Sequence, residues 1–261
     1  MAPMDPTDST LSEERPSAPR KRTPWIIAGA LVVVVAVLAV ALATRGGDED
    51  PVPPGVPSVD VTVTIPAGGS IQAAVDAAEP GTTFKLAAGL HREQQVTPRP
   101  GDVFEGVGDE TVLSGARVLE GWESGPTGWS VGGQTQEGVQ HGQCRPESPR
   151  CDRPEELFID GQRLRHVASL ADVAPDTWSF DYAADRIHIG VDPAGRLVET
   201  SVTPFAFRSD AAGVVIRDLV VTHYATQTQY GTIHAAGTDW TIEGVTSIDN
   251  HATGMFLNGD R

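Results

Sequence analysis

Short segments in which apolar and polar residues alternate recur from about Val61 onward, and a period of two is the pattern of half-buried β-strands. Val61–Ile65 reads Val-Thr-Val-Thr-Ile, and Thr82–Leu86 is expected to form the next strand. Further short strands are expected at Gln95–Thr97, Val103–Glu105 and Thr111–Leu113. Gly and Ser-Gly follow the last two, so the pattern predicts many short strands separated by turns.

One segment has helical rather than strand periodicity. Between Ile71 and Ala78, apolar residues recur at the i, i+3, i+4, i+7 spacing of an amphipathic helix. Ser70 precedes them and is a favourable N-cap, because its hydroxyl can accept a hydrogen bond from the first helical turn. Pro80-Gly81 ends the helix.

A repeat lies near the C-terminus. Ile216–Val221 matches Ile242–Ser247 at an offset of 26 residues, and Gly231–Ile233 matches Gly254–Phe256 at an offset of 23. Apolar residues alternate inside each copy, with Gly, Asn or Asp at its ends. A period of this length is typical of one solenoid coil. Leucine-rich repeats share the length, but their Leu-x-x-Leu-x-Leu pattern is absent.

The repeat is interrupted between Gly121 and Thr203. Leu157–Leu164 carries Asp-Gly between two apolar strands, which is a strong hairpin signal. Pro175–Tyr182 and Arg186–Ile189 form a second expected hairpin. An antiparallel β insertion is therefore predicted between the coils.

Two stretches resemble the opening of the pectate-lyase-like right-handed parallel β-helix families. Ile65–Arg92, with the short helix between two strands, resembles their N-terminal cap. Gly101–Gly115, which reads Gly-Asp-x-Phe-x-Gly-x-Gly … Thr-x-Leu-Ser-Gly, resembles their first coils. The insertion resembles one found in β-helix proteins grouped with glycoside hydrolases and polysaccharide lyases, where it can border the substrate groove. A solenoid exposes its apolar interior at each end, so the helix is expected to cover the first coil.

The expected fold class is all-β: a right-handed parallel β-helix with a capping helix and a small antiparallel insertion, preceded by one transmembrane helix. The sequence stops at Arg261 in mid-coil by the repeat alignment, so we expect an incomplete chain. The expected regions are a disordered cytoplasmic tail (1–23), a transmembrane signal-anchor (24–44), a Pro/Gly/acidic linker (45–59), the cap and first coils (60–120), the insertion (121–205) and further coils (206–261).

The membrane segment is Trp25–Ala43, an uninterrupted run of uncharged and almost wholly apolar residues. At about 1.5 Å per residue the run matches the ~30 Å thickness of a bilayer's hydrocarbon core. Arg20–Arg22 precede it and Asp48–Asp50 follow it, which predicts a cytoplasmic N-terminus and an extracytoplasmic C-terminal part. The alternative is a secreted protein cleaved near Ala43, but the run exceeds the ~7–15 residues of a signal-peptide core.

The formal net charge is −16, with only two lysines, Lys21 and Lys85. This charge argues against nucleic acid as a partner, because binding phosphates needs clustered Lys and Arg. The acidic surface either serves solubility or concentrates a cation such as Ca²⁺. No metal-ligand set is identified in the sequence.

Cys144 and Cys151 are the only cysteines. In an exported protein, an even count at short spacing predicts one disulfide. A zinc site would need more ligands, and only His141 is nearby.

The sequence contains no nucleophile elbow, HExxH, Walker A loop or dinucleotide glycine fingerprint. Glycosidases need two carboxyl groups beside the scissile bond, and polysaccharide lyases need a base with Ca²⁺ or Arg to neutralise a uronate. The repeat alignment superposes residues 222–225 on 248–251, just past each repeat strand. The catalytic candidates are Asp249, His251, His223 and Asp218, and Asn250 is a candidate for substrate binding. The competing interpretation is that Asn and Asp at coil corners satisfy turn backbone.

Trp178, Phe180 and Tyr182 alternate with polar residues along the second expected hairpin and so share one face, from which Trp178 and Tyr182 are singled out. They are candidates for a sugar-stacking platform, and the alternative is that they pack the insertion onto the coils. The leading hypothesis is a membrane-anchored carbohydrate-active protein, a glycosidase or polysaccharide lyase acting on an extracellular or cell-envelope glycan. The alternative is a non-catalytic glycan-binding or envelope scaffold. Two carboxylates from adjacent coils within ~5–10 Å of each other in an open groove would favour hydrolysis, whereas a groove lined only by aliphatic and small polar groups would favour the scaffold.

Overall fold

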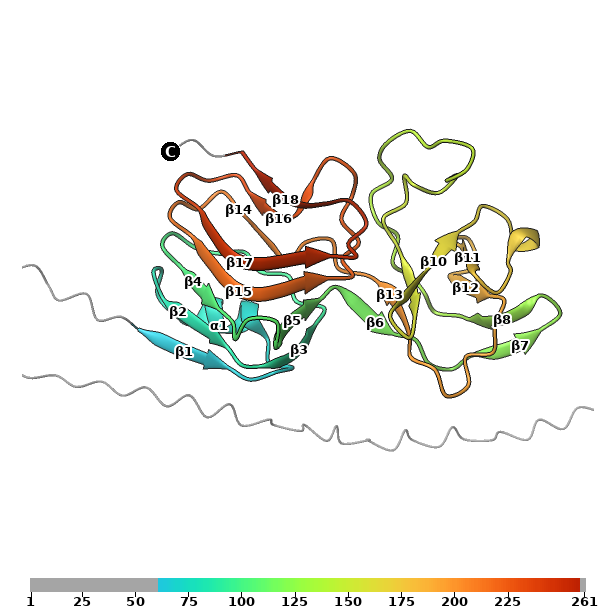
Figure 1. Cartoon of the computed structure of the whole chain (residues 1–261), viewed down its shortest axis with the longest axis horizontal. Helices are drawn as coiled ribbons and strands as arrows, with labels where there is room; N and C mark the ends of the chain where they lie inside the picture. The colour runs from blue at the N-terminus through green and yellow to red at the C-terminus, as the bar shows by residue number, and fades with distance from the viewer. Residues whose placement is uncertain (1–60, 259–261) are drawn as a thin grey trace, which may run out of the picture. The chain divides into compact units, whose positions relative to one another are not determined.

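The computed structural model describes residues 61–258, which form three β-sheets and one short α-helix (Figure 1). The predicted cytoplasmic tail, membrane segment and linker lie outside these residues. Within the described part of the chain, no helix is long and apolar enough to cross a bilayer.

Parallel strands from successive coils stack on one another, as expected of a β-helix. One column pairs β1, β2, β4, β15 and β17 in that order, every pair parallel. The second half of β15 also pairs with β5, which pairs with β3, and a separate column is β14-β16-β18. The bounds are β1 Thr62–Ile65, β2 Thr83–Leu86, β3 Gly89–Arg92, β4 Val103–Glu105, β5 Thr111–Ser114, β14 Phe207–Ser209, β15 Val215–Thr222, β16 Gly231–Ala235, β17 Thr241–Ile248 and β18 Thr253–Leu257. The prediction of a parallel β-helix is confirmed.

The strand pairing tests the repeat residue by residue. β15 and β17 pair with the predicted offset of 26, for example Ile216 with Ile242. The predicted offset of 23 for the second pair of strands is wrong by one residue, because Ile233 pairs with Met255. Met255 packs on the solenoid core, whereas Phe256 is 36% exposed. Aligning the two glycines misassigned the register, and a slip of one residue moves every side chain of a strand to its other face.

The expected strand at Gln95–Thr97 is reduced to a single parallel bridge between Val96 and Phe207. Val96 is nevertheless completely buried in the solenoid core. The apolar residue was therefore correctly assigned to the interior, although only one residue of the segment pairs.

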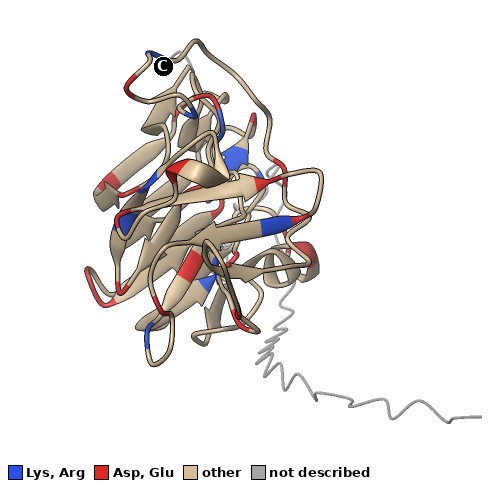
Figure 2. Cartoon of the chain, turned by 90° about the vertical axis from the view of Figure 1, so that its right-hand side faces the viewer, with Lys and Arg blue, Asp and Glu red and all other residues tan. Residues whose placement is uncertain are grey.

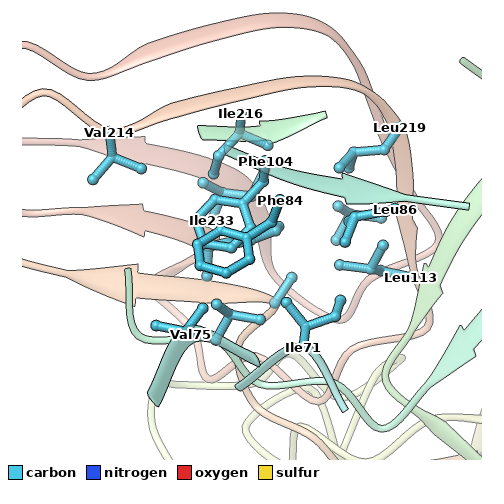
Figure 3. Close-up of a cluster of buried hydrophobic side chains, with 14 of the residues drawn as sticks. Ile71, Val75, Phe84, Leu86, Phe104, Leu113, Val214, Ile216, Leu219 and Ile233 are labelled. Carbon is cyan, nitrogen blue, oxygen red and sulfur yellow. The ribbon is translucent and has the colours of Figure 1, made fainter. Parts of the chain in front are cut away.

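The capping helix is α1, Ile71–Ala77, and Ser70 accepts a hydrogen bond from the backbone N–H of Ala73 at 3.2 Å. Ile71 and Val75 are completely buried and point into the same cluster as Phe84 and Leu113 (Figure 3). The helix therefore covers the apolar interior at the first coil, as its periodicity predicted.

Between β5 and β14 the chain builds a second, mostly antiparallel sheet beside the coils (Figure 1). Its strand order is β6-β13-β9-β10-β11-β12-β8-β7, and only β10 and β11 are parallel neighbours. We call residues 116–201 the insertion. The bounds are β6 Ala116–Val118, β7 Glu123–Gly125, β8 Gly128–Val131, β9 Leu157–Ile159, β10 Gln162–His166, β11 Thr177–Asp181, β12 Arg186–Ile189 and β13 Val198–Ser201, with a 3-10 turn at Leu170–Asp172.

Both predicted hairpins are present in the insertion. β9 and β10 pair around Asp160-Gly161, whose φ angles of +50° and +76° suit a two-residue hairpin turn. β11 and β12 form the second hairpin. The buried side chains of the insertion form a cluster of their own, distinct from the solenoid core.

Candidate functional site

One corner of the solenoid carries the polar cluster that the repeat alignment predicted. Thr222 and Ile248 pair, and the chain turns immediately after them at His223 and Asp249, with φ of +58° and +53°. His and Asp are among the residues that tolerate this left-handed conformation best. The alignment therefore correctly placed these two residues at the same corner of successive coils.

Asn250 connects two successive coils at this corner through hydrogen bonds of its side-chain amide. Its Oδ1 accepts a hydrogen bond from the backbone N–H of Tyr224 at 2.9 Å, one coil earlier. Its Nδ2 donates to the carbonyl of Val221 at 3.1 Å and to the hydroxyl of Ser247 at 3.0 Å. Both polar atoms of the amide are thus engaged in contacts within and between coils, so a sugar would have to displace them.

His223 and Asp218 occupy different environments. The His223 ring stacks on Phe158 of β9, with ring centroids 3.8 Å apart, and so contacts the insertion. Burial lowers the pKa of His223, partly offset by the nearby carboxylates of Glu199 and Asp249. Asp218 lies at another bend, inside β15, where its φ is +57°.

A cavity of about 710 Å³ lies between the insertion and the last described coils. Four arginines, two glutamates and two histidines line it, and only His251 among them was singled out from the sequence. These charged side chains are Arg150, Arg153, Arg163, Arg165, Glu155, Glu156, His166 and His251. Arg163 and Arg165 are two residues apart on β10 and so share one face of the strand. This i, i+2 spacing of two arginines on an expected strand is the sequence pattern that could have identified this side of the cavity.

Arg163 joins two carboxylates, one from the insertion and one from the coil corner. Its Nη1 lies 3.4 Å from Glu156 Oε1, and its Nη2 lies 3.9 Å from Asp249 Oδ1. Because one planar guanidinium bridges them, these carboxyl groups lie within about 10 Å of each other. Asp249 does not itself line the cavity, whereas Arg163 and Glu156 do.

His251 connects the coil corner to the insertion through both ring nitrogens. Nδ1 lies 2.7 Å from Glu156 Oε1, and Nε2 lies 3.0 Å from the carbonyl oxygen of Cys151. Both partners are oxygen acceptors, one a carboxylate and one a backbone carbonyl. His251 thus connects two segments that lie about 100 residues apart in sequence, and we call its two contacts the His251 clamp.

The Cys144–Cys151 disulfide is confirmed, with a Cα–Cα distance of 5.4 Å. It closes a small loop whose end carries Arg150 and the carbonyl group bound by His251. The disulfide thus constrains one wall of the cavity. Among residues 61–258, no group of three or more His, Cys, Asp or Glu side chains is placed to hold a metal ion.

The aromatic pair proposed as a sugar platform lies in the core of the insertion. Trp178 is completely buried and stacks on His166 at 4.0 Å, so a sugar-stacking role would require this core to open. Tyr182 is partly buried, donates a hydrogen bond to Glu155 Oε2 at 2.9 Å and lies 4.4 Å beneath the guanidinium of Arg153. Burial, with the charge of Glu155, raises the pKa of Tyr182.

His166 is more than nine-tenths buried, and neither ring nitrogen has a hydrogen-bond partner among the described residues. Burial, together with the positive charges of Arg150 and Arg153, lowers its pKa to about 3. The ring is therefore neutral at ordinary pH and packs on Trp178, on the face of β10 opposite to Arg163 and Arg165.

The fold defines the class of protein, a parallel β-helix with an antiparallel β insertion. No family model matches the chain, and no curated protein matches it either. A solved structure described as "The complex structure of XylC with xylose" is similar, with a TM-score of 0.53 and 14% identity over 66% of this chain and 38% of that chain. A second, described as "Glycoside hydrolase", has a TM-score of 0.40 and 12% identity over 63% of this chain and 51% of that chain. The chain thus spans about two fifths of XylC, and the likeness is one of fold.

Proposed function

We propose that the protein is a carbohydrate-active β-helix protein that binds an extracellular or cell-envelope polysaccharide in the cavity between the insertion and the coil corner. The observation that carries the proposal is the joining of Glu156 and Asp249 by Arg163 at the edge of this cavity. Pairs of carboxyl groups about 5–9.5 Å apart are the working groups of most glycosidases. The presence of xylose in the XylC complex is a further reason to test sugars.

The cavity and the neighbouring coil residues carry groups suited to two kinds of cleavage. Hydrolysis would use the Glu156 and Asp249 carboxyl groups, one as a proton donor and one in the ionised form. A lyase would use arginines to neutralise a uronate carboxylate while a base removes the adjacent proton. His251, His223 and Asp218 remain candidate groups, and Ca²⁺ is a candidate cofactor for the lyase reaction.

A non-catalytic glycan-binding or envelope scaffold is the second candidate. The observation that favours it is that the side chains of Asn250 and His251 are already engaged in holding coils and insertion together. In that case the cavity would hold a glycan without cleaving it.

The deciding experiment incubates the full chain, purified in a mild detergent, with neutral and acidic polysaccharides, each with and without EDTA. New reducing ends indicate hydrolysis, and ultraviolet absorbance of an unsaturated product indicates a lyase. Asp249→Asn should abolish turnover by hydrolysis, while Glu243→Gln, a strand residue outside the cavity, is the matched control. Retention on a glycan without turnover would support the scaffold. If the chain neither retains nor cleaves any of the glycans, the proposal is overturned.

The proposal includes anchoring by residues 25–43 with the described domain outside the cell. After cell fractionation, the chain should remain in the membrane pellet through a high-salt wash. Protease added to intact cells should degrade the domain. Release of a soluble domain beginning near residue 44 would instead support the secreted alternative.

A further inference from the structure

A second cavity, of about 430 Å³, lies between the first coil and the insertion and shares no lining residue with the cavity described above. Its volume is within the range of ordinary small-ligand pockets. We call it the first-coil cavity. None of the site residues predicted from the sequence lies in its lining. The lining side chains that can form hydrogen bonds are Glu93, Gln95, Arg117, Thr135, Gln136 and Thr203.

Glu93 places this cavity at the same corner of the solenoid as the candidate catalytic groups, but several coils away. The chain turns at Glu93 with φ of +53°, as it does at Asp249. Three successive parallel pairings connect the two corners: β3 with β5, β5 with β15, and β15 with β17. At about 4.8 Å per pairing the corners lie roughly 14 Å apart, so a single small group cannot contact both. The first-coil cavity is therefore a separate site.

The charges of the first-coil cavity compensate each other. Its charged lining residues are Glu93 and Arg117, and Arg117 donates from Nε and Nη2 to the same oxygen, Glu93 Oε2, at 3.2 Å and 3.0 Å. This geometry leaves the second oxygen of Glu93 and Nη1 of Arg117 for a ligand. Figure 2 likewise shows acidic and basic residues interspersed over the insertion side of the molecule. An uncharged ligand therefore suits this cavity better than an ion.

Gln136 provides an independent sign that a hydrogen-bond donor is missing from this arrangement. Its Nε2 donates to Gln134 Oε1 at 3.2 Å, which fixes the orientation of the amide. Its Oε1 is buried and has no hydrogen-bond partner among residues 61–258. Buried polar atoms in proteins are almost always hydrogen-bonded, so this oxygen points to a donor supplied from outside. The exposed amide of Gln95 lines the same cavity.

We infer that the first-coil cavity binds an uncharged, hydroxyl-rich sugar residue, and that its contacts are Gln95, Gln136 and the Glu93–Arg117 pair. A sugar hydroxyl both donates and accepts hydrogen bonds, and these amide, carboxylate and guanidinium groups offer both functions within one small space. Adjacent hydroxyl groups of one ring can bond to the free carboxylate oxygen and to the free guanidinium nitrogen together.

The inference rests on the proposed function and adds a second contact for the same glycan. A sugar residue in the first-coil cavity lies away from the candidate carboxyl groups, so it holds the glycan in place without taking part in cleavage. Two linked contacts raise the affinity for a long glycan more than either contact does alone. The first-coil cavity thus selects glycans that carry neutral units at a distance from the site of cleavage.

The test labels the glutamine side chains of the full chain with ¹⁵N, in a mild detergent, and follows their amide signals by nuclear magnetic resonance. The probes are neutral hexasaccharides of glucose, galactose and mannose, with glycerol as a free polyol. At least one hexasaccharide should shift the signals of Gln95 and Gln136, because these amides contact it, and glycerol should not. Gln143, which is exposed and lines neither cavity, should keep its signal unchanged.

Gln95→Ala and Gln136→Ala should each weaken the binding of that hexasaccharide about three- to tenfold, because each removes one or two hydrogen bonds. Gln143→Ala is the matched control and should bind as the parent does. Gln95 is exposed, so its substitution keeps the test valid even where Gln136→Ala disturbs the fold. A circular dichroism spectrum equal to that of the parent verifies the fold of each variant.

A shift of the same signals by glycerol as large as that by the hexasaccharide would indicate a general polyol site and refute the assignment to a sugar. Binding that survives both glutamine variants but is lost in Arg163→Gln would locate the sugar in the other cavity, which contradicts the inference and leaves the proposed function intact. If no hexasaccharide shifts Gln95 or Gln136 while a polysaccharide is still retained or cleaved, the inference alone fails. If no polysaccharide is retained or cleaved either, both fail.

Discussion

The solenoid and the insertion use their side chains in opposite ways. In the solenoid, aromatic and aliphatic residues from successive coils stack inside, as in the 5.1 Å contact between Phe84 and Phe104, and polar residues at the corners satisfy backbone. In the insertion, strands and loops direct arginine, glutamate and histidine side chains toward the coil corner. The coils thus form one side of the cavity, and the insertion supplies most of the charged side chains that line it.

The strongest test of this contrast removes a large side chain from the solenoid core. Phe104 is completely buried between Phe84 and Phe207, so Phe104→Ala should lower the free energy of unfolding by about 3–5 kcal/mol. Chemical denaturation measures this. A loss below about 1 kcal/mol would mean that the stacked interior is not what stabilises the coils.

A second test breaks the clamp between the two regions. His251→Ala removes both hydrogen bonds to the insertion and should cost about 2–3 kcal/mol, because one of them is to a carboxylate. Limited proteolysis should then cut faster between Cys144 and Cys151. His188→Ala, on β12 outside the cavity, is the control. Equal protection of the loop in the His251 variant would show that the insertion docks by other contacts.

The third test uses pH. The pKa of His166 is about 3 in the folded protein and near 6.5 when unfolded, so the unfolded state binds more protons between these values. Its contribution to stability is therefore fully present above pH 6.5 and is lost progressively as the pH falls toward 3. Between pH 7 and pH 5 the loss should be about 2 kcal/mol. His166→Phe should remove this part of the pH dependence. An identical pH profile in variant and parent would refute the assignment.

The smallest expected effect concerns a bend of the solenoid. Gly244 has φ of +61°, and a Cβ there would lie 2.5 Å from Asp218 Oδ1 of the preceding coil. Gly244→Ala should cost about 1 kcal/mol, because an L-residue with a Cβ is strained in this conformation. Asp218→Gly should be neutral or stabilising at the equivalent bend. If Gly244→Ala unfolds at a higher temperature than Asp218→Gly, the positive φ at this bend does not determine the stability of the coil.

Much of the fold could be predicted from local patterns. The cap helix follows from the spacing between Ile71 and Ala78, and the first hairpin follows from Asp160-Gly161. The register of β18 could not be predicted, because Thr253, Gly254 and Met255 give no local preference between two pairings that differ by one residue. Backbone pairing with β16 decided which of Met255 and Phe256 faces the core.

The sequence by itself determined the coil period, the capping helix, the hairpins and the disulfide, because each depends on residues close together in the chain. Only the tertiary structure decided the site. In the folded chain Trp178 is completely buried, and His251 contacts the insertion. Arginines from residues 150–165 line one side of the cavity, and residues 228–253 line the other. Contacts across about 100 residues leave no periodic signal, since they depend on how two separately folded sheets meet.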